Sequence, residues 1–458
     1  MNTHLNPVAE TGSAQFARIA DFVLDPALAI PDDALRHTST LLIDTLGVAA
    51  GATRLEVGHI ARDYAADFHL ATPGNTAPML FDGRIASQPG AAWALATQID
   101  NLDGHDGLME TKGHIGCAVV PALCALAERS PDLSGPDALR AMAMSYEFAA
   151  RAGLALHDTV SDYHTSGAWN ALGVAALACR LAGSDAETLR HAVGIAEYHG
   201  PRSQMMREID NPTMLHDGSG MGALVGLNAA FLAGRGFTGA PAITVEAADV
   251  AKFWDDLGTR WTVAENYVKP YPICRWAHAA IDAVRQVMDD HGLTHTDIAA
   301  IKIRTFDEAA RLFAEMPAST TEAQYSMHFA VATMVRYRDL APRHIEGASL
   351  SDPEVAAILP RISVETGEEH NARFPAGRWS DVEITLHDGR VLASGDTPAS
   401  GGPGAWRSDA DVEAKVLSFC DGVLSDTRAK AIWALRDGLL DGAKLSDLTK
   451  LITAPGDA

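Results

Sequence analysis

Cysteines are few in this sequence, and none is placed to pair with another nearby. The 458 residues include five cysteines, which occur singly and without a C-x-x-C motif: Cys117, Cys124, Cys179, Cys274 and Cys420. An odd number of scattered thiols with apolar neighbours is typical of reduced, buried side chains. The pattern therefore argues against a disulfide framework.

Cations are also scarce. The chain has 36 Lys and Arg residues against 59 Asp and Glu residues, which gives a formal net charge of −23. Such a field repels polyanions, so nucleic acid and anionic membrane surfaces are not expected partners. It also repels small anions. A site for an anionic substrate must therefore gather a few Arg, Lys or His side chains.

Targeting and membrane-spanning segments are lacking too. The first residues, Met1–Ala14, are polar and hold no apolar run. The longest apolar stretches, Ile115–Ala127 and Ala171–Cys179, are too short to span a bilayer. We therefore expect a cytoplasmic protein that does not associate with a membrane.

Several motifs for cofactor binding and catalysis are absent. There is no P-loop, no G-x-G-x-x-G after a strand, no G-x-S-x-G and no H-E-x-x-H. The segment Gly218–Gly222 is rich in glycine, but it opens a predicted helix and no strand precedes it. We interpret these glycines as a helix-packing feature, and we predict an active site that works without a cofactor.

The composition is that of a folded protein, with 47% hydrophobic and 21% charged residues. Helical patterns dominate from Pro31 to Arg235. Two of these segments, Ala168–Ala182 and Gly218–Gly234, are crowded with small residues and nearly free of charge. Small side chains let helix backbones approach closely, so we expect these two helices in the middle of the helical region.

The pattern changes near Glu265. Residues Ile298–Thr305 alternate between apolar and polar, and Asp388-Gly389 between two short apolar runs predicts a hairpin. Helical patterns return from Asp409 to Ile452. The sequence therefore predicts a mainly α fold, in which a large all-helical domain (1–264 plus 405–458) carries an inserted, smaller α/β lid domain (265–404) with an antiparallel sheet.

The densest polar cluster runs from Asp100 to Asp106 and continues with Lys112-Gly113-His114. His114 directly precedes an apolar helical segment, so an anion beside it would meet unpaired helix N–H groups. The histidines and carboxylates of the cluster would also suit a divalent metal. The alternative is a solvated loop with capping aspartates. We favour a functional site because buried segments flank the loop on both sides.

Two further segments could contribute chemistry. Tyr163 and His164 stand just before the helix predicted at Ala168–Ala182, where a single histidine is often only a cap. The second segment, Val268–His278, lies at the predicted domain junction, where ligand clefts tend to form. Its cations are Lys269, Arg275 and His278, and the arginine can hold a carboxylate through two parallel hydrogen bonds. An ordinary structured linker is the alternative for this segment.

Together these segments resemble proteins of the MmgE/PrpD family. The resemblance rests on Asp100–His114 with the following Val119–Leu123, on His164 before a small-residue helix, and on Lys269–Arg275 with His278–Ala283. It covers nearly the whole chain. It implies a helical domain with a smaller lid-like α/β domain, usually in a homodimer. Known members include 2-methylcitrate dehydratase, cis-aconitate decarboxylase and iminodisuccinate epimerase, which act on small polycarboxylates.

The resemblance also implies site residues. Asp100, His114, His164 and Lys269 match positions that line the active site in the decarboxylase branch. The sequence departs from that branch at Thr213, where the decarboxylase has a lysine before a Leu-His pair. Its acidic loop is also longer and carries His105 and Lys112. Arg202 or Arg207, which lie nearby in sequence, could compensate for the missing lysine.

The reactions of this family share one demand, because a proton next to a carboxylate must be moved. Such a step needs a positioned base and cations that stabilise enolate-like charge. We therefore predict that His114 and His164 transfer protons, that Asp100 orients a histidine and that Tyr163 is a second acid. Lys269 holds a carboxylate of the substrate and is counted with these catalytic groups. The predicted substrate-binding residues are Arg275, His278, Lys112, His105, Arg202 and Thr213.

The Thr213 departure favours a dicarboxylate over a citrate-like substrate. The leading prediction is epimerisation of a small amino or imino dicarboxylate such as iminodisuccinate. The alternative is a hydro-lyase that dehydrates a 2-methylcitrate-like acid. From other classes we keep a metal-dependent hydrolase, with Asp100, Asp103, His105 and His114 as ligands, and a non-enzymatic carboxylate-binding protein. Our preferred interpretation includes no metal.

Overall fold

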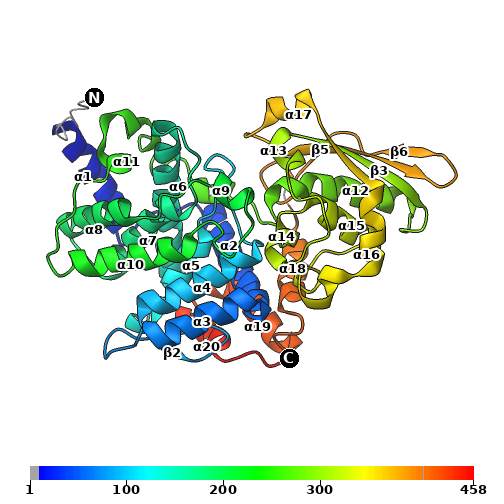
Figure 1. Cartoon of the computed structure of the whole chain (residues 1–458). Helices are drawn as coiled ribbons and strands as arrows, with labels where there is room; N and C mark the ends of the chain where they lie inside the picture. The colour runs from blue at the N-terminus through cyan, green and yellow to red at the C-terminus, as the bar shows by residue number, and fades with distance from the viewer. Residues whose placement is uncertain (1–9, 406) are drawn as a thin grey trace.

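The computed structural model describes residues 10–405 and 407–458. It has two parts, which lie side by side in Figure 1. The first is helical and the second combines helices with a sheet, and the fold is mainly α as predicted. Residues 1–9 of the polar N-terminal segment lie outside the described range. Within that range, no helix has both the length and the apolar character that a bilayer crossing requires.

The helical part consists of segments from both ends of the chain. Its helices are α1 (Glu10–Leu24), α2 (Asp32–Gly51), α3 (Glu56–Phe68), α4 (Gln88–Leu102), α5 (Gly116–Leu126), α6 (Gly135–Thr159), α7 (Gly167–Leu181), α8 (Ala186–His199), α9 (Met206–Ile209), α10 (Ser219–Ala233), α11 (Ile243–Glu246), α18 (Asp409–Cys420), α19 (Asp426–Leu440) and α20 (Leu445–Thr453). A short hairpin, β1 (Ala77–Pro78) with β2 (Ile85–Ala86), also belongs here, so this part is not purely helical.

The small-residue helices α7 and α10 pack against each other in the middle of the helical part, as the sequence predicts. Both also contact α5, and α10 contacts α4. The close approach depends on glycine. A Cβ atom at Gly226 of α10 would lie 2.5 Å from the carbonyl oxygen of Ala171 on α7, which is closer than real Cβ contacts. The five cysteines are all buried and free.

The α/β part follows residue 277. Its elements are α12 (His278–His291), β3 (Ile298–Thr305), α13 (Asp307–Ala310), α14 (Thr320–Gln324), α15 (Met327–Tyr337), α16 (Pro353–Ile358), β4 (Ile362–Thr366), α17 (Glu368–Arg373), β5 (Trp379–Leu386), β6 (Val391–Ala393) and β7 (Thr397–Pro398). Helix α12 packs on β5 and on α15.

The strand order is β4-β3-β5-β6, and β7 pairs with the start of β5. Three of these pairings are antiparallel, including the predicted β5–β6 hairpin, whose Gly389 has a φ of +86°. The pairing of β3 with β4 is parallel, so the sheet is mixed rather than antiparallel throughout. A parallel pair needs a long crossover, and here the chain from α13 to α16 supplies it.

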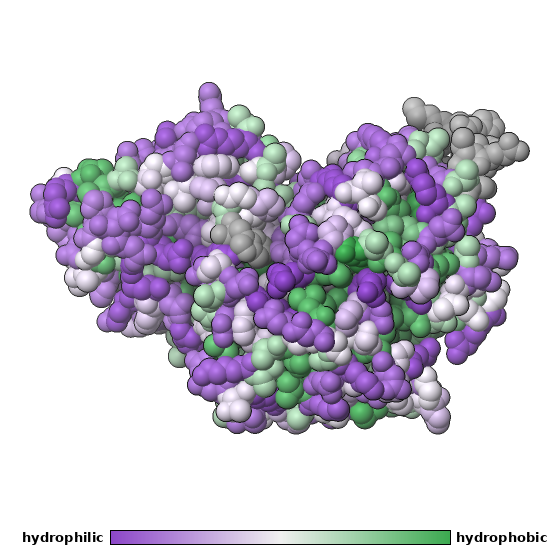
Figure 2. Space-filling model, turned by 180° about the vertical axis from the view of Figure 1, so that it is seen from behind, coloured by the Kyte–Doolittle hydropathy of each residue, from purple (hydrophilic) through white to green (hydrophobic). Residues whose placement is uncertain are grey.

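After the α/β part, the chain returns to the helical part. Helices α18 and α19 pack on α2, and α19 also contacts α6. A buried ion pair fixes this return, because Nζ of Lys415 on α18 lies 2.7 Å from Oδ1 of Asp44 on α2. Seen from the back, apolar side chains gather on the helical part beside the junction, whereas most of this face is hydrophilic (Figure 2).

Candidate active site

A small cavity lies where the polar loop after α4 meets the segment that leads into α12. Its volume is about 40 Å³, which is enough for a water molecule but far below the size of a usual ligand pocket. A dicarboxylate therefore requires side chains or the two parts of the molecule to move apart. The lining residues are Asp103, Lys112, His114, Tyr163, Met205, Ile209, Asp217, Tyr267, Lys269, Cys274, Arg275, Trp276, Tyr325 and Arg378.

His114 is held at the wall of this cavity just before α5. Its Nδ1 lies 2.6 Å from the backbone carbonyl oxygen of Asp106. Because a carbonyl only accepts, Nδ1 carries the proton in this hydrogen bond and Nε2 is the basic nitrogen of the neutral ring. Nε2 lies 3.5 Å from Oδ2 of Asp217. Burial lowers the pKa of His114, and the charge of Lys269 lowers it further. The ring is therefore neutral and able to accept a proton near pH 7.

Lys269 and Asp103 form the main ion pair of the site. Helix α4 ends because Asp103 adopts a left-handed conformation with a φ of 53°. Nζ of Lys269 donates to Oδ1 of Asp103 and, at 3.1 Å, to its backbone carbonyl oxygen. Burial acts to lower the pKa of Lys269, but the Asp103 carboxylate outweighs it and the pKa is raised. The lysine is therefore charged.

Two arginines from different segments line the same cavity. Arg275 donates from its terminal nitrogens to the carbonyl oxygens of Ser400 and Ala399, at 2.5 and 3.0 Å. Its guanidinium carbon lies 4.3 Å from the centre of the Tyr267 ring. Arg378, just before β5, donates to the carbonyl oxygen of Pro375. The Nε atoms of both arginines are buried without a hydrogen-bond partner, so each retains a donor for an anion.

Three tyrosines complete the polar lining. The Tyr163 hydroxyl donates to the backbone carbonyl oxygen of Lys112, and the Tyr325 hydroxyl donates to Glu208. Among the described residues, the Tyr267 hydroxyl has no hydrogen-bond partner. Burial raises the pKa of Tyr267, while Lys269 and Arg275 act in the opposite direction. Tyr267 therefore keeps a proton that it can give to a bound ligand.

Asp100 and His105 lie beside the cavity rather than in its lining. The Asp100 carboxylate accepts from the backbone N–H of Ser219 at 3.0 Å and so caps the start of α10. Nε2 of His105 lies 3.7 Å from Oδ1 of Asp100, and the His105 ring stands edge-on to the His114 ring at 4.5 Å. Asp100 therefore lies beside His105, which packs on His114, but no hydrogen bond joins Asp100 to either ring among the described residues, and its orienting role stays a prediction.

His164 and His278 are turned to backbone partners. Nδ1 of His164 lies 3.3 Å from the carbonyl oxygen of Ser203, and Nε2 of His278 lies 3.0 Å from the carbonyl oxygen of Ile273. Neither lines the cavity. Arg202 and Thr213 are exposed and also lie outside it, whereas Lys112, Tyr163, Lys269 and Arg275 line it, and their roles stay predictions.

Four lining residues that carry a charge or a hydroxyl are not predicted from the sequence: Asp217, Tyr267, Tyr325 and Arg378. Asp217 had a visible signal, because it follows His216 directly before a small-residue helix. This is the same kind of position as that of His114 and His164. Arg378 had none. It stands just before β5, about 100 residues from Arg275, and only the packing of the α/β part brings the two together.

Potential metal ligands also meet here. One nitrogen of His105, one of His114 and a carboxylate oxygen of Asp103 lie within 4.8 Å of one another. Both ring nitrogens of His105 are buried without a hydrogen-bond partner. However, Lys269 already donates to the Asp103 carboxylate, so a cation at this point would be repelled by a fixed positive charge.

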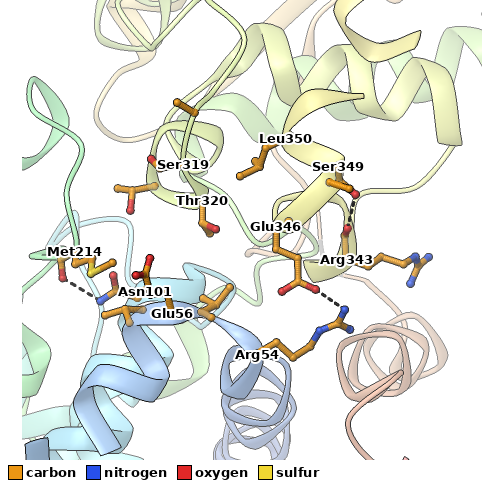
Figure 3. Close-up of a pocket in the computed structure, with 16 residues that line it drawn as sticks. Arg54, Glu56, Asn101, Met214, Ser319, Thr320, Arg343, Glu346, Ser349 and Leu350 are labelled. Atoms are coloured by element: carbon orange, nitrogen blue, oxygen red, sulfur yellow. Dashed lines mark hydrogen bonds and ion pairs between the residues drawn. The ribbon is translucent and has the colours of Figure 1, made fainter. Parts of the chain in front are cut away.

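A larger pocket of about 660 Å³ opens elsewhere between the two parts (Figure 3). Asn101 and Met214 form one side, where Nδ2 of the asparagine donates to the methionine carbonyl oxygen at 3.1 Å. On the other side Arg54 and Glu346 pair with each other. No histidine or lysine is among its lining residues. The smaller cavity, in contrast, is lined by His114, Lys112 and Lys269.

The fold and site define a mainly helical protein with a charged cavity at the junction to an α/β part. The sequence matches the MmgE/PrpD N-terminal domain over residues 17–254 and the MmgE/PrpD C-terminal domain over residues 271–439. The chain therefore belongs to the MmgE/PrpD family, as the sequence motifs predict.

Two curated relatives are cis-aconitate decarboxylases. The chain is 24% identical over 453 residues to the enzyme from Homo sapiens, covering 93% of this chain and 92% of the relative. It is 23% identical over 457 residues to the enzyme from Mus musculus, covering 93% and 90%. These relatives place the chain in a family that includes lyases.

Proposed function

We propose that the protein moves a proton at the carbon next to a carboxylate of a small di- or tricarboxylate, with His114 as the base. The observation that carries this proposal is the hydrogen bond from His114 Nδ1 to the carbonyl oxygen of Asp106, at 2.6 Å. It fixes the tautomer in which Nε2 holds a lone pair beside the cavity. The low pKa of the buried ring supports the same role, because a base must be unprotonated to act.

The cations of the cavity hold the substrate carboxylates in this proposal. The Nε–H groups of Arg275 and Arg378 lack acceptors in the described residues, and a carboxylate supplies them. Lys269 adds positive charge beside the carbon that loses its proton. Removing that proton spreads negative charge onto the adjacent carboxylate, and positioned cations stabilise this charge in a site that excludes water.

We propose epimerisation as the overall reaction. His114 takes the proton from one face of the carbon, and Tyr267 gives its hydroxyl proton to the other face. The ring of Tyr267 lies under the Arg275 guanidinium, which stabilises the resulting tyrosinate. We assign this second role to Tyr267 rather than Tyr163, because the Tyr163 hydroxyl already donates to Lys112. His164 stays a candidate that mutation can test.

A lyase reaction is the second candidate, and the relatives favour it. Both named relatives are cis-aconitate decarboxylases, and each aligns with almost the full chain. A dehydratase would use the same base, but would expel hydroxide from the neighbouring carbon. Its product would be an unsaturated acid.

The test is a screen of small di- and tricarboxylates in D₂O, followed by NMR and by ultraviolet absorbance. Epimerisation predicts solvent deuterium at the inverted carbon, with no alkene. Growth of ultraviolet absorbance at the rate of substrate loss would instead establish a lyase. If no compound exchanges a proton or turns over although it binds, the non-enzymatic carboxylate-binding protein would be correct.

Chelation tests the metal alternative. Loss of activity in EDTA, restored by a divalent ion, would support a role for Asp103, His105 and His114 as ligands. The homodimer also remains a proposal. Light scattering of the purified protein measures it directly.

A further inference from the structure

Asp217 is a buried carboxylate at the cavity whose two oxygens have different surroundings. Oδ1 accepts from the backbone N–H of Ser166 at 3.2 Å and from its hydroxyl at 2.7 Å. Oδ2 has no hydrogen-bond donor among the described residues, and the nearest ring nitrogen, the unprotonated Nε2 of His114, lies 3.5 Å away. One oxygen is thus fixed by the protein, and the other is left for something in the cavity.

The position of Asp217 aligns it with His114. Ser166 precedes the N-terminus of α7, where the helix dipole favours a negative charge. The Ser166 hydroxyl that donates to Asp217 also accepts from the backbone N–H of His114, at 2.9 Å. Ser166 therefore positions both the Asp217 carboxylate and the backbone of His114.

The charges around the cavity leave Asp217 without a counterion. Its lining contains two acids, and Asp103 is already paired with Lys269. Among the described residues, His114 is the one basic side chain within ion-pairing distance of Asp217, and that ring is neutral when it acts as a base. A free carboxylate repels the carboxylates of a substrate. The Asp217 carboxylate therefore favours binding only of a substrate that also carries a positive charge.

The spacing of the two acceptors indicates where that charge sits. Nε2 of His114 and Oδ2 of Asp217 are 3.5 Å apart. When Nε2 faces a C–H bond, Oδ2 can reach a hydrogen on the atom bonded to that carbon. The atoms H–C–N–H of a protonated amine fit this arrangement, and the positive nitrogen also makes the C–H more acidic.

We propose that Asp217 is a specificity-determining residue that binds a protonated nitrogen on the carbon that loses its proton. Asp217 thereby selects, among small polycarboxylates, those that carry an ammonium group over hydroxy acids. This inference rests on the proposed function, in which His114 is the base. It adds to that function a protonated nitrogen on the reacting carbon of the substrate, and it names Asp217 as the residue that binds this nitrogen.

The experiment compares ligands that differ only in whether a nitrogen or an oxygen is bonded to the reacting carbon. Binding of aspartate and malate, and of iminodisuccinate and its ether analogue oxydisuccinate, is measured by calorimetry on the full chain. Wild-type protein is expected to bind the amine of each pair more tightly, by roughly 10- to 100-fold, because a charged hydrogen bond is lost with the oxygen analogue. Equal binding, or preference for the hydroxyl or ether, would overturn the proposal without any variant.

Asp217→Asn then tests the residue. The amide keeps the shape and can still accept from Ser166, but it loses the charge, so the preference for the amine is expected to fall about tenfold or more. The matched control is Asp441→Asn, which removes one charge from an exposed side chain after α19 and should keep the preference. An unchanged preference in a folded Asp217→Asn protein would show that Asp217 is only a counterion for His114.

Failure of the proposed function gives a different result. Solvent deuterium exchange at the carbon is followed by NMR for every ligand that binds. Exchange with an unchanged ligand preference in Asp217→Asn contradicts the role of Asp217 alone. If no ligand exchanges a proton with solvent, the proposed proton transfer by His114 is contradicted, and the inference about Asp217 loses the reaction on which it rests.

Discussion

Nζ of Lys269 donates to the carboxylate of Asp103, the left-handed residue at which α4 ends. Only 1% of the lysine side chain and 6% of the aspartate side chain are exposed. The pair ties the segment before α12 to the polar loop after α4. Two stretches of sequence separated by more than 160 residues thereby form one wall of the cavity.

This relationship predicts a loss of stability in Lys269→Met. The variant leaves the Asp103 carboxylate buried without its cation, which typically costs about 3–5 kcal/mol of unfolding free energy. Urea denaturation measures the change. The double variant Lys269→Met/Asp103→Asn removes both charges and should recover part of the loss. A single variant as stable as wild type would mean that the pair is not formed in solution.

The two predicted catalytic histidines are expected to behave differently. His114→Gln should lower kcat by roughly 10²- to 10⁴-fold, because it removes the general base. His164→Gln should have a smaller effect, since His164 lies outside the cavity lining and its Nδ1 faces a backbone carbonyl. Steady-state kinetics and circular dichroism of both variants provide the test. An equal loss in folded His164→Gln would return His164 to the mechanism.

The pH dependence of activity should report on His114. Burial lowers its pKa from the ordinary value of 6.5, so kcat/KM should rise with pH along a limb centred below that value. Lys269 also lowers this pKa. Replacing it by glutamine should therefore move the rising limb to higher pH. A wild-type limb centred above pH 6.5 would argue that another group is the base.

Arg275→Lys and Arg378→Lys should weaken substrate binding. Lysine keeps the charge but lacks the Nε–H group that is buried without an acceptor in both arginines. A charged hydrogen bond is worth about 1.5–3 kcal/mol, so KM should rise by roughly 10- to 150-fold in each variant. Arg390→Lys, in the exposed β5–β6 hairpin, is the control and should leave KM unchanged. Unchanged KM in both test variants would place the carboxylates elsewhere.

Asp106 should make the folded state less stable at higher pH. Burial, together with the charge of Asp44, raises its pKa from 3.8 to about 7. Because the pKa is raised in the folded state, the contribution of Asp106 to stability is most favourable below pH 3.8 and falls until the pH passes about 7. The full difference is roughly 4 kcal/mol. Thermal unfolding of Asp106→Asn and wild type at pH 5 and pH 8 should show a smaller loss in the variant. Parallel pH profiles would contradict the shift.

The sequence was most informative where the signal is local. The small-residue patterns predicted α7 and α10, and the turn residues Asp388-Gly389 predicted the β5–β6 hairpin. The motifs around His114 and Lys269 predicted the family and segments that meet at the cavity. Each of these features depends on residues a few positions apart, whose periodicity and backbone preferences are written into the chain.

Tertiary packing decided the rest. The sequence could not tell that β4 runs parallel to β3, because the crossover between them has no strand signal of its own. It placed His278 and Thr213 among the binding residues, whereas the structure buries one against a backbone carbonyl and exposes the other. It did not find Arg378 or Asp217. The rotation of each helix and the docking of the two parts decide which side chains face one cavity. Both are set by the burial of apolar surface over the whole chain, and not by residues a few positions apart.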